Sequence, residues 1–250
     1  MIGPKRTRRQ LRALSAKHNI KFCLYQTSDE KEMVHLLSEI FAERDPPAVA
    51  VGLNPSEFEA FVRLFCPQAA DQGLTIVARC AETEEMCGAL LTEDSASGLS
   101  DGIDRLSAKF NPIFDILGQL DEEYRGGEIV APGESIHLFL LGVSKHFSGK
   151  GVAHQLVTEC LANGASKGYF KAVTEATNRT SQHIFRKQGF IERVRRSYSE
   201  YQFDGRASFA SITDQGGPIL MDKQLTLVRD GQQRPYTGGP KRPLLAESTR

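Results

Sequence analysis

The sequence of 250 residues contains no tryptophan and no apolar run that approaches the ~18 residues of a membrane span. Met1 is followed by a charged stretch and not by the apolar core of a secretory signal. We therefore expect no membrane partner and a cytoplasmic location.

Cysteine is also scarce. The five cysteines, at positions 23, 66, 80, 87 and 160, include no CxxC pair and no Cys/His spacing that is typical of zinc sites. Most of them lie within apolar runs, which favours reduced core thiols over disulfides or metal ligands. We expect no resident metal.

The formal net charge of zero hides an uneven distribution along the chain. Residues 1–19 carry six basic side chains and no acidic one, and residues 229–250 carry five basic and two acidic ones, so the region between them is acidic. Basic ends are typical of solvated tails; an organellar targeting segment and a nucleic-acid contact are the alternatives at the N-terminus. We predict tails at 1–19 and 227–250, one folded domain at 20–226, no nucleic-acid partner, and a monomer or homodimer.

Hydrophobic periodicity within the folded region alternates between strand and helix patterns. The strand patterns span residues 21–25, 74–81, 87–92, 136–143, 171–176, 190–203 and 218–225. The helix patterns begin at Ser28 and end before Pro46-Pro47, begin at Asn54, span 112–124, begin near Val152, and span 178–188. This order predicts a mixed α/β (α+β) fold with about seven strands in one sheet and helices against it.

The most informative segment joins the apolar strand at 136–143 to the helix that begins near Val152. Its turn reads Ser148-Gly149-Lys150-Gly151. Free N–H groups at a helix start, together with the positive end of the helix dipole, suit a pyrophosphate. Two glycines allow the phosphate to approach the backbone, and Lys150 adds a charge-assisted contact.

Two familiar nucleotide loops do not fit this segment. Gly142 and Gly149-Lys150 are separated by six residues instead of four, and Gly151 stands where a Walker A loop has its hydroxyl residue. No GxGxxG of the Rossmann type occurs there. A glycine-rich turn that binds no ligand remains open on these residues alone.

The motif Ser148-Gly149-Lys150-Gly151-Val152-Ala153 resembles the pyrophosphate loop of the GNAT superfamily of acyl-CoA-dependent N-acyltransferases, Arg/Gln-x-x-Gly-x-Gly/Ala. The stretch from Asn178 to Gly189-Phe190 is similar to the second signature of that family, a helix that ends in Lys-x-Gly-Phe. The resemblance implies a mostly antiparallel sheet splayed at its fourth strand, with acetyl-CoA as co-substrate. The positions it assigns to CoA binding are Leu141, Gly142, Val143, Ser148, Gly149, Lys150, Gly151, Val152, Ala153, His154, Asn178, Ser181 and Phe185.

The chain departs from the family pattern at two of these positions. Ser148 occupies the Arg/Gln position, so phosphate binding would rest on backbone N–H groups with Lys145 or Lys150. Phe185 stands where many members have a tyrosine that acts as general acid, and phenylalanine has no proton to donate.

A narrower resemblance is to the arylalkylamine N-acetyltransferase group. Phe41-Ala42-Glu43-Arg44-Asp45-Pro46-Pro47 looks like the segment in which these enzymes carry an acid, usually glutamate, just before a proline. Ser181 stands where the group has a serine, and Tyr198 follows the Gly-Phe pair at a similar spacing. Asp45 is one methylene shorter than the usual glutamate.

The chemistry requires a base, because an alkyl amine with a pKa near 10 must lose a proton before it attacks a thioester. We predict Asp45 as this base, with a solvated turn residue as the alternative interpretation, and Glu175 as second choice. His137 and His146 are weaker candidates, because a lone histidine beside an apolar strand is usually structural.

By resemblance, the Val143 N–H stabilises the thioester oxyanion, and Leu141 contributes similarly. Ser181, Tyr198 or water would protonate the departing thiolate.

We expect transfer of an acetyl or similar acyl group to a small-molecule primary amine. The acidic residues Glu43, Asp45, Glu82, Glu84, Glu85 and Asp94 would attract a cationic acceptor, and residues 94–108 with the helix at 112–124 would cover its site. Two other functions remain open: a non-catalytic acyl-CoA sensor, which Ser148 and Phe185 suggest, and acetylation of a protein or peptide.

Overall fold

The computed structural model describes residues 19–98, 100–226, 228–229 and 232–233. The tails predicted at 1–19 and 227–250 lie almost wholly outside the described residues. The central sheet has seven strands in the order β1-β2-β3-β4-β5-β7-β6. The strands are β1 (Ile20–Leu24), β2 (Ile76–Cys80), β3 (Met86–Asp94), β4 (Ser135–Val143), β5 (Lys171–Ala176), β6 (Ile191–Arg195) and β7 (Ile219–Gln224). A separate hairpin pairs β8 (Val228–Arg229) with β9 (Gln232–Gln233).

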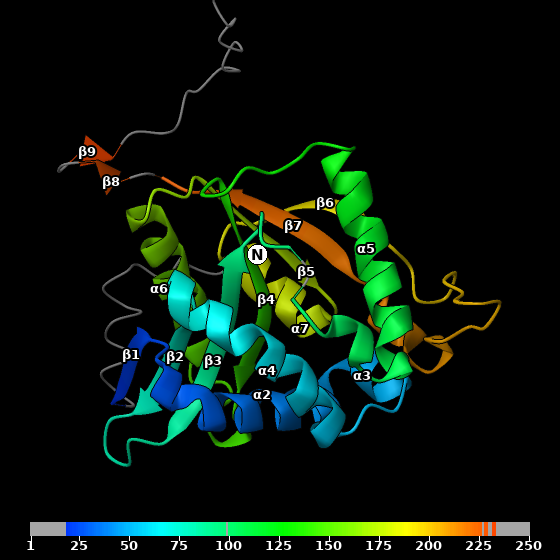
Figure 1. Ribbon diagram of the computed structural model, residues 1–250, viewed down its shortest axis with the longest axis horizontal. Coiled ribbons are helices and arrows are strands. Elements are labelled where there is room, and N and C mark those ends of the chain that lie inside the picture. The colour runs from blue at the N-terminus through cyan, green and yellow to red at the C-terminus, as the bar shows by residue number, and fades with distance from the viewer. Residues whose placement is uncertain (1–18, 99, 227, 230–231, 234–250) are drawn as a thin grey trace, which may run out of the picture.

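All neighbouring strands of this sheet are antiparallel except β4 and β5, which confirms the predicted mixed α/β fold. Helices cover both faces (Figure 1). On one face lie α2 (Glu30–Arg44), α3 (Pro46–Ala50), α4 (Pro55–Gln72) and α5 (Asn111–Arg125). On the other lie α6 (Val152–Ser166) and α7 (Arg179–Lys187). None of the helices in these described ranges is long and apolar enough to cross a membrane.

The strands β4 and β5 pair only at their first residues, where Ser135–His137 of β4 meet Lys171–Val173 of β5. Just beyond, the Thr174 hydroxyl donates to the Leu138 carbonyl at 2.7 Å, in place of a backbone partner. On the other side of β4, the register against β3 shifts between Leu138 and Leu140. Such a bulge bends the strand. The sheet therefore opens at its fourth strand, as the motifs implied.

Three local predictions were wrong. A 3₁₀ turn (Thr27–Asp29) occupies the expected helix start at Ser28, so α2 begins two residues later. The additional short helix α3 begins at Pro46, because Asp45 caps its N-terminus. The strand predicted at 190–203 ends at Arg195. Its aromatic residues Tyr198 and Tyr201 leave the sheet and join the core beneath α2–α5 instead.

The approach of α2 to β4 explains why residue 142 is glycine. A Cβ built at Gly142 would lie 2.7 Å from Leu37 Cδ2 and 3.2 Å from Ile40 Cδ1. Both of those side chains belong to α2. A larger residue at position 142 would therefore push α2 away from the part of β4 that borders the open edge.

We expect Gly142→Ala to destabilise the fold by about 1–3 kcal/mol through overpacking against α2. The matched control is Gly118→Ala in α5, where an added Cβ meets nothing within 4 Å and helix propensity favours alanine. Urea unfolding compares the two variants with the parent chain. Equal stability of Gly142→Ala and the parent would contradict the steric explanation.

Candidate active site

A cavity of about 340 Å³ lies on the α2–α5 side of the sheet, next to the opening between β4 and β5. Its apolar wall comes largely from phenylalanine rings, which contact one another edge-on or stacked. These are Phe41, Phe58, Phe61, Phe65, Phe110, Phe114 and Phe139. Ser95, Ser97 and Ile103, with several residues of α5, also line the cavity. Residues 94–108 and the following helix, which we predicted to cover the acceptor site, thus contribute to the lining of this cavity.

Asp45 lies in the wall of this cavity, between α2 and α3. Its Oδ2 accepts from the Ala48 N–H at 3.4 Å, as the N-cap of α3, and its Oδ1 accepts from the Thr177 hydroxyl at 2.7 Å. Burial raises the pKa of Asp45 to about 6, although the hydrogen bonds from Thr177, Ala48 and Asn178 act in the opposite direction. A carboxyl group with this pKa exchanges protons near neutral pH.

Thr177 connects Asp45 to Tyr198. The Tyr198 hydroxyl donates to the Thr177 carbonyl at 2.8 Å, and Tyr198 is only 1% exposed. Burial, and then the charge of Asp45, raise the pKa of Tyr198. Tyr198 does not line the cavity. Its hydroxyl thus holds Thr177 in place, which argues against the predicted role of Tyr198 as proton donor to a thiolate.

The start of α7 contributes three more of the predicted residues to the cavity wall: Asn178, Ser181 and Phe185. Asn178 and Ser181 form a capping box, in which the Ser181 N–H donates to Asn178 Oδ1 at 3.0 Å. The Ser181 hydroxyl donates to the Asn178 carbonyl at 2.9 Å. Phe185 is 2% exposed and packs edge-on against Phe190, so it shapes the apolar wall.

Glu175 also lines the cavity, but it is paired with a histidine. Its Oε2 lies 2.5 Å from His137 Nε2, and His137 Nδ1 lies 3.4 Å from Glu93 Oε1. Burial lowers the pKa of His137, but the two carboxylates outweigh it and raise the value to about 10. Burial likewise raises the pKa of Glu175, but the charge of His137, its hydrogen bond and smaller contributions that include the charge of Arg125 together outweigh burial, and the net shift is downward. Neither Glu93 nor its contact with His137 was predicted.

The open edge of β4 presents backbone N–H groups. The Ser144 N–H donates to the Cys87 carbonyl of β3 at 2.9 Å. Because N–H directions alternate along a strand, those of Leu141 and Val143 point to the edge where β5 has diverged. Leu141 lines the cavity and Val143 does not. The Val143 carbonyl accepts from Arg44 Nη2 at 2.9 Å.

The glycine turn predicted to bind pyrophosphate adopts the left-handed backbone that glycine allows. The φ angles of Gly149 and Gly151 are +74° and +84°. Gly151 is the N-cap of α6 and offers no side-chain cap, so the first N–H groups of that helix have no intrahelical acceptor. The ammonium group of Lys150 lies over the Phe147 ring, 4.8 Å from its centroid. Ser148 is exposed on the same turn.

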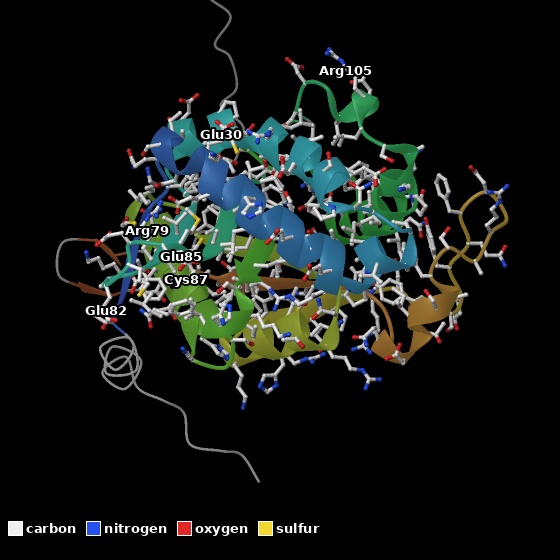
Figure 2. The ribbon with its side chains drawn as sticks, turned by 90° about the horizontal axis from the view of Figure 1, so that it is seen from below. Glu30, Arg79, Glu82, Glu85, Cys87 and Arg105 are labelled. Atoms are coloured by element: carbon white, nitrogen blue, oxygen red, sulfur yellow. The ribbon has the colours of Figure 1, made fainter. Side chains whose placement is uncertain are left out.

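The six acidic residues that we expected to attract a cationic acceptor do not lie together. Of these six residues only Asp45 lines the cavity. Figure 2 shows Glu82 and Glu85 at the β2–β3 turn, far from the labelled Arg105 of the segment that covers the cavity. Glu84 pairs with Lys21 at 2.6 Å, and Asp94 accepts from Tyr169 and from the Gly133 N–H. Residues distant in the sequence, Glu93, Asp121 and Glu175, supply the other carboxylates of the wall.

The five cysteines are free, and all but Cys23 are buried, which confirms the prediction of reduced thiols. Within the described ranges, no group of three His, Cys, Asp or Glu side chains is arranged to hold a metal ion.

Comparison with known proteins agrees with this geometry. Residues 121–205 match the model of the acetyltransferase (GNAT) domain. The arylalkylamine N-acetyltransferase 2 of Aedes aegypti has a TM-score of 0.71 at 18% identity, over 82% of this chain and 99% of that one. The C-terminal condensation domain of Ebony, solved with β-alanyl-dopamine, has a TM-score of 0.75 at 15% identity, over 82% and 99%. The polyamine N-acetyltransferase of Drosophila melanogaster has a TM-score of 0.66 at 14% identity, over 82% and 100%. At these identities the structures show a shared fold.

We expect Thr177→Val to raise the pKa of Asp45 by about one unit, because a hydrogen bond to a charged acceptor contributes about 1.5–3 kcal/mol and one pKa unit is about 1.4 kcal/mol. The carboxyl carbon resonance of Asp45, followed by NMR against pH and assigned with Asp45→Asn, measures this shift. Thr177→Ser keeps the hydroxyl and should leave the midpoint where it is. A midpoint unmoved by Thr177→Val would disprove the contact.

The raised pKa of Asp45 also predicts a pH-dependent gain in stability for Asp45→Asn. A carboxyl group with a folded pKa near 6 and an ordinary value of 3.8 stabilises the fold fully below pH 3.8, and this contribution is lost as the pH rises through 6. At pH 8 the variant should therefore be more stable by up to about 3 kcal/mol, with the difference vanishing near pH 4. Urea unfolding at both values, with exposed Asp214→Asn as control, checks this. A difference independent of pH would contradict it.

Proposed function

The chain carries an acetyltransferase domain of the GNAT type, and on this premise we propose that it transfers an acetyl group from acetyl-CoA to a small primary amine with an apolar, aromatic portion. The observation that carries the proposal is the position of Asp45. This carboxyl group lies in an aromatic cavity that borders the open edge of β4 and the start of α7. A base, an apolar acceptor cavity and free backbone donors thus lie together.

The residues present suit acyl-CoA at two places. The α6 N-terminus, with Gly149 and Gly151 in left-handed conformation, suits the pyrophosphate. The unpaired edge of β4 beyond His137 suits the amide groups of the pantetheine arm, which can pair with a strand edge. Exposed Ser148 adds no charge, so binding there rests on backbone N–H groups and Lys150.

In the proposed reaction the ammonium form of the acceptor gives one proton to the Asp45 carboxylate. The neutral nitrogen then attacks the thioester carbon and a C–N bond forms, which leaves a second, acidic proton on the nitrogen of the intermediate. As the C–S bond breaks, the departing thiolate takes up this proton, either through the Ser181 hydroxyl, which gives one proton and receives another, or through water. The pKa of Asp45 near 6 keeps it largely ionised at neutral pH and able to accept a proton.

Of the two backbone donors predicted for the oxyanion, we favour Leu141. Its N–H points to the open edge of β4, and its residue lines the cavity that contains Asp45. Val143 lies outside that lining, with its carbonyl bound by Arg44. One aligned backbone donor lowers the barrier by about 3 kcal/mol.

The acceptor should be largely apolar and flat. Eight phenylalanines line the cavity, and an aromatic substrate would bury its ring among theirs. An arylalkylamine N-acetyltransferase and a polyamine N-acetyltransferase both share this fold. The apolar wall favours the first of these acceptor types over a polyamine, whose charges would lose solvation there.

We expect wild-type chain to release free thiol from acetyl-CoA with phenethylamine or tryptamine, and much less with spermidine, kanamycin or a lysine-containing peptide. Asp45→Asn should lower kcat by about 10²-fold or more, because the base is removed while the amide keeps the contact with Thr177. CoA binding without release for any acceptor would indicate an acyl-CoA sensor. Preferred release with the peptide would indicate a protein acetyltransferase.

We expect Gly151→Ala to weaken binding of acetyl-CoA by about tenfold or more, because alanine strains a backbone at φ +84° and displaces the phosphate-facing N–H groups. The matched control is Gly168→Ala, with φ +96° just beyond the other end of α6. Both variants carry similar strain, but only the first should lose affinity. Calorimetry with acetyl-CoA measures the two; equal affinities would rule out this loop as the pyrophosphate site.

A further inference from the structure

Three ionisable side chains meet in the cavity wall at the place where β4 and β5 stop pairing. His137 of β4 lies between Glu175 of β5 and Glu93 of β3, with one ring nitrogen facing each carboxylate, at 2.5 Å and 3.4 Å. Each ring nitrogen can donate to its carboxylate only if it carries a proton. With both hydrogen bonds formed, His137 is therefore positively charged. We call these residues the His137 trio. It combines two negative charges with one positive charge and is therefore anionic as a unit.

The trio lies close to the proposed base along the same wall. Glu175 and Thr177 are separated by one residue at the end of β5, so their side chains face the same side, about 7 Å apart along an extended chain. Thr177 binds Asp45 through its hydroxyl at 2.7 Å. The carboxylates of Asp45 and Glu175 therefore occupy neighbouring parts of one cavity, and both belong to its lining.

The two carboxylates have opposite surroundings. Asp45 accepts only from neutral donors, a hydroxyl and backbone or amide N–H groups. Glu175 is bound by an imidazolium, and its side chain is 10% exposed. Two carboxyl groups with such different environments can have different roles in one site, because one can take up a proton while the other remains charged.

We propose that Glu175, kept ionised by His137, binds the ammonium group of the incoming amine, and that Asp45 then accepts its proton. The inference rests on the proposed function and adds a cation-binding role for Glu175, with His137 and Glu93 as positioning residues. His137 also moderates the attraction, because its positive charge offsets one of the two carboxylates. Because the ammonium group is then bound less tightly, it loses its proton to Asp45 more readily.

The other charged groups of the cavity wall have their own partners. Arg125 pairs with Asp121 at 2.7 Å, and the Lys171 ammonium lies over the Tyr124 ring at 5.4 Å from its centroid. Glu93 receives a further hydrogen bond, at 2.9 Å, from Gln68. The neutral Gln68 leaves the charge of the trio unchanged.

The test compares a cation with its neutral isostere on the full chain at pH 7, without acyl-CoA. The probes are phenethylammonium and 2-phenylethanol, measured by calorimetry. Glu175→Gln keeps the shape of the side chain and removes its charge, so we expect the dissociation constant of phenethylammonium to rise by about tenfold or more. That of 2-phenylethanol should stay unchanged. Equal weakening of both probes, or of neither, would overturn the proposal.

Two further variants make the result decisive. Glu123→Gln breaks an ion pair with Arg196 on the exposed face of α5 and should alter neither affinity. Should Glu175→Gln fail to fold, Glu93→Gln removes one negative charge from the other side of His137. It should weaken the cation alone, by about threefold or more, as expected of a partly screened charge. Weaker binding of both probes, or of neither, would again count against a cation-binding role for the His137 trio.

Kinetics separate this inference from the function on which it rests. If the chain is an active enzyme, kcat/KM of Glu175→Gln should fall mainly because KM rises. In Asp45→Asn, kcat/KM should fall because kcat falls. A loss in Glu175→Gln confined to kcat would overturn the anchoring role. If the parent chain acetylates no amine, the proposed function fails, and the two-probe comparison still decides whether Glu175 binds cations.

Discussion

The structure depends on the separation of β4 from β5. A parallel pair normally continues along both strands, but here it stops after three residues and is replaced by contacts between side chains and backbone. Thr174 fixes the last point of contact, and the bulge at Phe139 turns β4 away. The separation exposes backbone donors on one strand, opens the cavity on the adjacent face, and leaves room at the edge for an extended ligand. The strand edge and the cavity on which the proposed function depends thus follow from one interrupted ladder.

The cavity then places two carboxylates in surroundings that push their pKa values in opposite directions. Burial raises the pKa of Asp45 more than its neutral hydrogen-bond donors lower it, whereas the imidazolium of His137 helps to hold that of Glu175 below its ordinary value. Asp45 lacks a cation because it caps a short helix, and Glu175 has one because β4 and β5 are still close at His137. The difference therefore arises from the backbone, because the position of each carboxylate in its helix or strand determines which group it contacts.

The sequence predicted best what depends on local backbone rules. Gly151 at a helix start and Asn178 at the opening of a helix each act within a few residues, so their positions could be inferred from neighbours. The sequence predicted poorly the contacts between residues that lie far apart along the chain. The contact of His137 with Glu93 joins residues 44 apart, and no local pattern marks it. Tyr198 and Tyr201 belong to a segment predicted as strand, yet they leave the sheet because the core beneath the helices buries both rings.

The two departures from the family pattern have different physical consequences. Phe185 is buried against Phe190, so the position where many GNAT enzymes have an acid serves the apolar wall here, and the proton donor that we propose, Ser181, lies one helical turn earlier. That hydroxyl donates to the Asn178 carbonyl at 2.9 Å and accepts from the Asn178 N–H at 3.4 Å, so it must break the first of these contacts to give its proton to a thiolate. Ser148, by contrast, is exposed and removes a charge from the pyrophosphate turn. The left-handed glycines remain, and because backbone donors need no side-chain charge, the anion site depends on helix geometry more than on residue identity.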